Sequence, residues 1–206
     1  DTLDAALQAA KDNDTIYLGE GTYSSYGSKV VQDKGLSLTF IGAGIGETTW
    51  NIGTGATDTG NQYNGDFSFR GNNKLVFKDM TLKAGVTPSG DQVTRNYMGF
   101  THTEITVVEG CVIDGLTFYW GYTSAEFKNT TFNCPKVEKD GFNVGEYALW
   151  TYCSPVMTFD NCTFNSYGKV INVYNENSAA DYTINFNNCT VNNTDTPVKQ
   201  VLNIND

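Results

Sequence analysis

The stretch Phe159-Asp160-Asn161-Cys162-Thr163-Phe164 decides the fold, because two short alternating segments meet in it at an asparagine. A left-handed backbone conformation costs little for glycine and least otherwise for asparagine and aspartate. Asn161 therefore predicts a one-residue corner between two strands. Period-2 alternation directs Phe159, Cys162 and Phe164 to one face and Asp160 and Thr163 to the other. We expect the first of these faces to be buried.

The same frame recurs along the chain at unequal distances. The other copies are Phe40-Ile41-Gly42-Ala43, Phe77-Lys78-Asp79-Met80-Thr81-Leu82, Val108-Glu109-Gly110-Cys111-Val112-Ile113, Phe127-Lys128-Asn129-Thr130-Thr131-Phe132 and Phe186-Asn187-Asn188-Cys189-Thr190-Val191. The corner positions Gly42, Asp79, Gly110, Asn129 and Asn188 all hold residues that tolerate a positive φ. A period-2 pattern repeated in this way predicts a parallel β-helix, with strands about 4.8 Å apart and like residues in ladders.

A third alternating segment lies between the copies, at residues 67–69, 97–100, 116–120, 148–152, 170–174 and 200–204. Three strands in each repeat predict an all-β solenoid of about seven coils. Residues 2–11 place Leu3, Ala6, Leu7 and Ala10 at helical spacing, so we expect a short N-terminal α-helix that caps one open end. Residues 1–206 are then a single domain, with the capping helix and first strand in 1–18 and the stacked coils in 19–206.

The composition narrows the classes of partner. The 206 residues carry a net charge of −10, and Arg70 and Arg95 are the only arginines. Such an acidic chain does not neutralise phosphate surfaces, so we expect neither nucleic acid nor an anionic membrane as partner. No apolar run approaches the roughly 18 residues that a membrane-spanning helix needs, which argues against direct membrane insertion. Because the sequence begins at Asp1 without an initiator methionine, we expect a segment of a longer chain with flanking domains.

The cysteines fall into two groups. Cys111, Cys162 and Cys189 share the inward column with Met80 and Thr130, where small polarisable side chains fill a solenoid interior. We expect these three to be free thiols. Cys134 and Cys153 lie outside the column, and whether they are thiols or a disulfide stays open.

Four asparagines begin an Asn-x-Ser/Thr sequence: Asn129, Asn161, Asn188 and Asn192. Three of the four are corner residues, whose side chains would stack along the solenoid. A glycan would disrupt that ladder, so a structural role is expected for these sequons.

The run Leu3-Asp4-Ala5-Ala6-Leu7-Gln8-Ala9-Ala10, together with Asp14-Thr15-Ile16-Tyr17-Leu18, Gly21-Thr22-Tyr23 and Leu38-Thr39-Phe40-Ile41-Gly42-Ala43-Gly44, resembles the entry coils of the right-handed parallel β-helix (pectate lyase-like) superfamily. The corners of the Asn-Cys-Thr-Phe type at residues 161–164 and 188–191 are also similar to that superfamily. The resemblance implies a right-handed solenoid. It does not imply one function, because the superfamily holds lyases, hydrolases, esterases, tailspikes, adhesins and stalks.

The catalytic signatures of those enzymes have no counterpart here. The two arginines stand outside any carboxylate cluster of the pectate lyase type, and the motifs of polygalacturonase-like hydrolases and pectin methylesterases do not occur. No cysteines or histidines have zinc-ligand spacing. We therefore predict no catalytic residue, no metal site and no cofactor.

Aromatic residues of the third strand suggest a binding face. If Tyr122, Tyr152 and Tyr174 align, Trp120 and Trp150 align beside them, with Asn172 in the same column as the tryptophans. One register presents Trp120, Tyr122, Trp150, Tyr152 and Tyr174 on the outer face, and the opposite register buries the tryptophans. Insertions near this strand would add Trp50, Tyr63, Tyr97 and Phe142 as loop residues of the site.

From these features we expect a non-catalytic recognition module of a bacterial surface protein, extracellular and either attached to the cell or secreted. Its aromatic face and loops would bind a host protein such as an immunoglobulin, or an extracellular glycan. Two alternatives stay open: a polysaccharide lyase or glycoside hydrolase with an unrecognised site, and a structural spacer.

Overall fold

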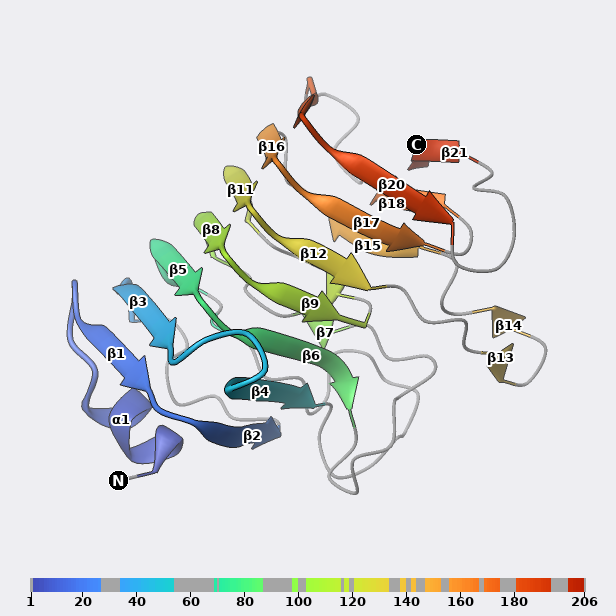
Figure 1. Cartoon of the computed structure of the whole chain (residues 1–206). Coiled ribbons are helices and arrows are strands. Elements are labelled where there is room, and N and C mark those ends of the chain that lie inside the picture. The colour runs from blue at the N-terminus through green and yellow to red at the C-terminus, as the bar shows by residue number, and fades with distance from the viewer. Residues whose placement is uncertain are drawn as a thin grey trace.

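The computed structural model describes residues 2–26, 34–53, 69, 71–86, 98–99, 103–115, 117–118, 121–133, 138–139, 142–143, 147–152, 156–166, 169–174, 181–193 and 200–205. This part of the chain is mostly β-strand, with one short helix. Most strands run parallel to their neighbours, and the strands that pair in parallel are separated in sequence by strands of other sheets (Figure 1). The arrangement is consistent with an all-β parallel solenoid.

Two sheets of seven strands dominate the described part of the chain. The first sheet contains β1 (Thr15–Leu18), β3 (Ser37–Gly42), β5 (Lys74–Lys78), β8 (Ile105–Glu109), β11 (Ser124–Lys128), β16 (Val156–Asp160) and β19 (Thr183–Asn187). The second sheet contains β2 (Gly21–Tyr26), β4 (Thr48–Gly53), β6 (Thr81–Val86), β9 (Val112–Asp114), β12 (Thr131–Asn133), β17 (Thr163–Ser166) and β20 (Thr190–Asn193). In both sheets the spatial order of the strands follows their order in the sequence.

A third sheet consists of β15 (Tyr147–Tyr152), β18 (Lys169–Tyr174) and β21 (Gln200–Asn205), paired in parallel. These strands match the segments expected at 148–152, 170–174 and 200–204. Two small pairs complete the described strands: β7 (Met98–Gly99) with β10 (Thr117–Phe118), parallel, and β13 (Glu138–Lys139) with β14 (Phe142–Asn143), antiparallel.

The corners between the first and second sheets confirm the role predicted for asparagine, aspartate and glycine. The backbone takes a positive φ of 53° at Asn161, and the other left-handed corners are Asp79, Gly110, Asn129 and Asn188. Each is followed by one residue whose side chain turns inward, and the next strand then begins. This local geometry explains why strands of the two sheets alternate along the chain.

Gly42 is the exception, and the prediction that it forms a left-handed corner is wrong. Its φ lies outside the positive range, and the chain continues through residues 43–47 before β4 begins. Glycine is required there for another reason, because a Cβ at Gly42 would collide with the carbonyl oxygen of Asp79. The constraint at this position is close approach of two backbone segments.

The helix α1 (Leu3–Ala9) lies at the end of the stack beside β1 and β2 (Figure 1). Thr2 caps it, because its side-chain oxygen accepts a hydrogen bond from the Ala5 N–H at 3.2 Å. Leu3 and Leu7 are buried and belong to the core cluster. The predicted capping helix is therefore present, one residue shorter at its start and two at its end than the 2–11 segment.

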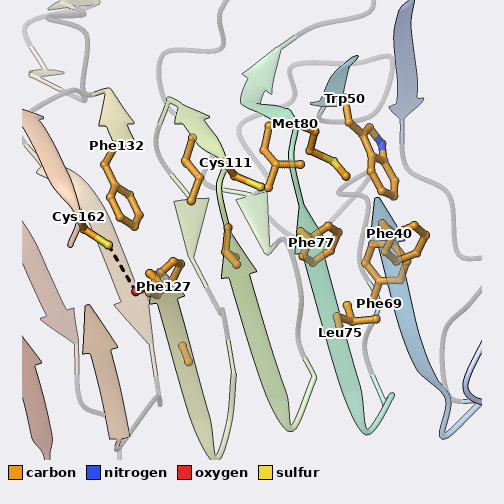
Figure 2. Close-up of a cluster of buried hydrophobic side chains, with 14 of the residues drawn as sticks. Phe40, Trp50, Phe69, Leu75, Phe77, Met80, Cys111, Phe127, Phe132 and Cys162 are labelled. Atoms are coloured by element: carbon orange, nitrogen blue, oxygen red, sulfur yellow. Dashed lines mark hydrogen bonds between the residues drawn. The ribbon is translucent and has the colours of Figure 1, made fainter. Parts of the chain in front are cut away.

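Aromatic side chains stack through the core at the spacing of the strands (Figure 2). Phe127 lies face to face with Phe159 at 5.0 Å between ring centroids, and Phe159 in turn with Phe186 at 5.2 Å. Phe132 and Phe164 repeat this arrangement in the second sheet at 4.8 Å. These repeats place an inward ring on that of the preceding repeat, and the stacked rings favour the observed register. Aliphatic side chains replace the ring at Val108 in the first sheet and at Leu82 and Ile113 in the second.

Candidate binding face

The third sheet holds most of the aromatic residues predicted to form a site, and its register agrees with the expected alignment. Trp150 pairs with Asn172, and Tyr152 pairs with Tyr174. At Trp150, Tyr152 and Tyr174 the structure describes the backbone but not the side chains. Paired residues of parallel strands share a face of the sheet, so Tyr152 and Tyr174 lie on the same face.

Ile171 indicates which face of the third sheet packs inward, because its side chain is fully buried. Positions 172 and 174 are each an odd number of residues from Ile171, so period 2 assigns both Asn172 and Tyr174 to the opposite face of the sheet. Val170 is also buried, so strict alternation does not extend to the start of β18.

Tyr122 lies in the bend ahead of β11 and not in a strand of the third sheet. Its N–H donates to the carbonyl oxygen of Thr103 at 2.8 Å. The bend requires glycine at position 121, because a Cβ there would collide with the backbone of Ser124. The described strand pairs do not include Tyr122, so its alignment with Tyr152 and Tyr174 stays a prediction. Its side chain is exposed, as the prediction of an outward position requires.

Trp50 is not a loop residue of a site. It lies in β4 with no exposed surface, and its ring makes an edge contact with Phe40 at 5.2 Å between centroids (Figure 2). Trp50 pairs with Leu82, another buried residue of the second sheet. Its indole is therefore part of the core.

The side chains of the remaining predicted site residues lie outside the described part of the structure. Trp120, Tyr63 and Tyr97 lie outside the described residues. Phe142 is described only through the backbone of β14. Their proposed contribution stays a prediction.

Five exposed large hydrophobic residues of the described ranges were not among the predicted site residues: Tyr17, Ile45, Val156, Phe186 and Val191. Tyr17, on β1, has 76% of its surface exposed, and Ile45 has 53% exposed. The alternation of Ile16 and Leu18 with Tyr17 could have identified Tyr17 as an outward residue, because both neighbours are at least half-buried. Tyr17 lies on β1, outside the third sheet, so its exposed ring is a suitable control position for substitutions in that sheet.

The outer face of the first sheet carries charges of alternating sign. Register places Lys78 beside Glu109, Glu109 beside Lys128, and Lys128 beside Asp160. The Lys78 ammonium lies 2.7 Å from the Glu109 carboxylate, and this hydrogen bond lowers the pKa of Glu109. Glu126, 3.1 Å from Lys128, raises the pKa of that lysine. Because both pairs are partly exposed, each contributes little to stability. The Lys78–Glu109 pair joins neighbouring strands, whereas Glu126 and Lys128 lie on the same strand.

The cysteine thiols of the inward column have low reactivity because the protein covers them. Cys111 and Cys162 are free and buried, as predicted, and Cys189 is free and half-buried. Burial raises the pKa of Cys111 to about 12 and that of Cys162 to about 11. Thiols with such pKa values are poor nucleophiles near neutral pH, which gives them a packing role. Cys134 and Cys153 lie outside the described residues.

The sequons at the corners take part in an amide ladder. Asn161 donates from Nδ2 to Oδ1 of Asn129 at 2.7 Å, and Asn192 donates in the same way to Asn165 at 3.0 Å. The structural role predicted for these asparagines is confirmed for Asn129, Asn161 and Asn192.

Within the described ranges, no three side chains of histidine, cysteine, aspartate or glutamate gather as metal ligands. None of the helices in the described part of the chain is long and apolar enough to cross a membrane. No protein-family model matches the sequence, and a search of curated proteins finds no match either.

Proposed function

We propose that the chain is a non-catalytic extracellular recognition module of a bacterial surface protein, of the adhesin type. In this proposal it binds a host protein such as an immunoglobulin, or an extracellular glycan, through the third sheet. The fold is then a right-handed parallel β-helix of about seven coils, related to the pectate lyase superfamily. The sequential strand order of both large sheets and the left-handed corners support that assignment.

The register of the third sheet is the observation on which the proposal rests. In this register, aromatic residues occupy neighbouring positions on adjacent strands. Tyr152 lies beside Tyr174, and Trp150 lies beside Asn172. Aromatic residues supply large contact areas at a low cost in conformational entropy, and their rings accept both sugars and apolar protein side chains. A regular sheet holds their backbone positions fixed before a ligand arrives, which lowers the entropy lost on binding.

Binding of the purified chain to an immobilised panel of pectins, mucin glycans and host secretory proteins including immunoglobulins tests the proposal. We expect saturable binding to one ligand, abolished by Trp150→Ala. Tyr17→Ala is the matched control, because it removes an aromatic ring with 76% exposure from a strand outside the third sheet. That variant should bind as the wild type does.

Three results would contradict the proposal. Absence of binding to every ligand would favour the structural spacer. Shortening of a polysaccharide on the panel would favour the lyase or hydrolase. Equal loss of binding in Trp150→Ala and Tyr17→Ala would show that the third sheet is not the binding face.

A further inference from the structure

The two large sheets end in strands whose inner face is partly uncovered. Among the described residues, β19 and β20 are the last strands of the first and second sheets. Phe186 has 36% of its surface exposed and Val191 has 39%. Phe159 and Phe164, which pair with them one repeat earlier, have no exposed surface. We call residues 183–193 the end layer. Its inward side chains lack a covering layer of the kind that buries Phe159 and Phe164.

The opposite end of the stack is covered. The helix α1 lies at the other end from β20 (Figure 1), and its residues Leu3 and Leu7 are buried in the core cluster. In the described part of the chain, the core is therefore accessible at the end layer and closed where the helix packs. A partner that covers the remaining apolar surface of the core has to bind the end layer.

The backbone of β19 has free hydrogen-bonding groups along its outer edge. The carbonyl oxygen of Asn187 accepts from the Asn161 N–H at 2.8 Å, so the peptide groups of Asn187 point towards β16. The peptide groups of successive strand residues alternate in direction, so those of Ile184 and Phe186 point to the opposite side. In the described structure β16 is the only strand that pairs with β19. A further strand can therefore be added along this edge.

The end layer lacks the residues that usually prevent pairing between exposed sheet edges. Its sequence, Thr-Ile-Asn-Phe-Asn-Asn-Cys-Thr-Val-Asn-Asn, contains no charged residue and no proline. Charged side chains, lysine above all, and prolines are the common means by which edge strands avoid one another. Two copies of a chain with a net charge of −10 repel each other, and an uncharged layer is where that repulsion is smallest.

The polarity of β19 is symmetrical about Asn185. Ile184 and Phe186, on either side of it, pack against the core, whereas Thr183, Asn185 and Asn187 are exposed. A two-fold axis through Asn185 would pair β19 with β19 of a second copy in antiparallel orientation. Ile184 would then lie opposite Phe186 of the second copy, on the inner face of both. These are the residues whose peptide groups point to the free edge, as the hydrogen-bonded pairs of an antiparallel ladder require.

The asparagine on the axis suits contact with its own copy. Asn185 donates from Nδ2 to Oγ1 of Thr158 at 3.5 Å, on the preceding strand. An asparagine amide has a second N–H and an acceptor oxygen, so two such amides can donate to each other across a two-fold axis. A charged side chain at this position could not pair with its own copy.

We propose that the end layer binds the end layer of a second copy of this chain. The two β19 strands join the first sheets of both copies, and Ile184 and Phe186 of each copy cover the inner face of the other. A second copy supplies the matching alternation and the absence of charge, because both surfaces are the same. Such a contact uses one end of each copy, and α1 covers the other end, so association stops at a closed dimer. The proposal does not depend on the ligand of the third sheet.

Sedimentation velocity of the purified chain at increasing concentration tests the proposal. We expect a species with twice the 22.6 kDa mass of one chain to grow with concentration, and no larger species to follow it. Asn185→Lys places two like charges opposite each other at the two-fold axis and should leave the protein monomeric. Because Asn185 is exposed, this variant should fold, which circular dichroism checks.

Thr15→Lys is the matched control. Thr15 is an exposed residue of β1 in the same register column as Asn185, at the end of the first sheet beside α1. The variant adds the same charge and should dimerise as the wild type does. Amide hydrogen exchange of the wild type locates the contact without any substitution. Residues 183–187 should exchange more slowly at concentrations where the dimer dominates, while exchange in β8 should not change.

Several results would overturn the proposal. A wild type that stays monomeric at every concentration would do so, as would a variant Asn185→Lys that dimerises normally. Equal dissociation of Thr15→Lys, or unchanged exchange in residues 183–187, would place the contact elsewhere on the molecule. Continued growth of species larger than a dimer would exclude a closed two-fold contact.

Discussion

The Cys162 thiol lies 3.4 Å from the backbone carbonyl oxygen of Phe127 and donates its hydrogen to it (Figure 2). Phe127 belongs to the preceding repeat, so this contact ties two neighbouring repeats together at their corner. Cys189 makes the equivalent contact with Phe159 at 3.4 Å. Thr130 makes it through its hydroxyl with Val108, at 3.5 Å. At Thr130, Cys162 and Cys189 the inward column that follows each corner therefore consists of small side-chain donors. Met80 fills the same column in its repeat without a donor hydrogen.

Substitutions of Cys162 can distinguish the contribution of its hydrogen bond to stability from the contribution of its packing. Threonine and valine have nearly the same shape, and the column already accommodates threonine at Thr130. We expect Cys162→Val to be less stable than Cys162→Thr by about 1 kcal/mol, the usual net contribution of one hydrogen bond. Urea unfolding of both variants measures the difference. Equal stability would mean that the thiol contributes through packing alone.

The left-handed corner at Asn161 predicts a clear order among substitutions. Alanine at a φ of 53° is strained, whereas glycine adopts that conformation freely. Asn161→Ala should be less stable than Asn161→Gly by about 1–2 kcal/mol. Both variants lose the amide contact with Asn129, so their difference isolates the backbone. Asn192→Ala serves as the control that loses one amide contact, to Asn165, at a position outside the left-handed corners. If glycine and alanine are equivalent at position 161, the corner does not require a positive φ.

The repeating frame could be predicted from the sequence because its causes are local. A corner needs a residue that tolerates positive φ, and a strand with one buried face needs period-2 alternation. Both requirements are visible in Phe159-Asp160-Asn161-Cys162-Thr163-Phe164 without knowledge of the neighbours. The same logic would have placed Trp50 in the core, since Thr49-Trp50-Asn51 repeats the pattern of Thr163-Phe164-Asn165.

The candidate site was less predictable because it depends on register across loops of different length. Tyr152 and Tyr174 align because their strands run through the sheet without interruption. Tyr122 lies instead in a bend ahead of β11, where the close approach of position 121 to Ser124 requires glycine. A steric contact between residues that pack only after folding leaves no periodic signal in the sequence. Gly42 shows the same limit, since its constraint comes from the carbonyl of Asp79 in the next repeat.

Docking of the capping helix should contribute strongly to stability. Leu7 has no exposed surface and belongs to the core cluster that also contains Leu18 and Leu38. Leu7→Ala should lower the free energy of unfolding by about 2–5 kcal/mol, as large-to-small changes at buried leucines do. Gln8→Ala, one residue further on the exposed side of α1, is the control and should have little effect. Thermal unfolding followed by circular dichroism compares the two. A small effect of Leu7→Ala would mean that the end of the stack is stable without the helix.

The buried thiols predict a loss of stability in alkaline solution. The pKa of Cys111 is raised by burial from 9.0 to about 12 in the folded protein, so between these values the unfolded chain releases a proton that the folded chain retains. The contribution of Cys111 is therefore fully present below pH 9 and is lost as the pH rises towards 12, by about 1.4 kcal/mol for each pH unit.

Tyrosines also titrate in this range, so the test compares the wild type with Cys111→Thr, which keeps a small donor and removes the ionisable group. Urea unfolding at pH 8 and pH 10.5, in the presence of a reductant, gives the pH dependence of each protein. The wild type should lose more stability than Cys111→Thr over this interval, by about 2 kcal/mol. Equal losses would show that Cys111 stays protonated in both states or is exposed in the folded protein.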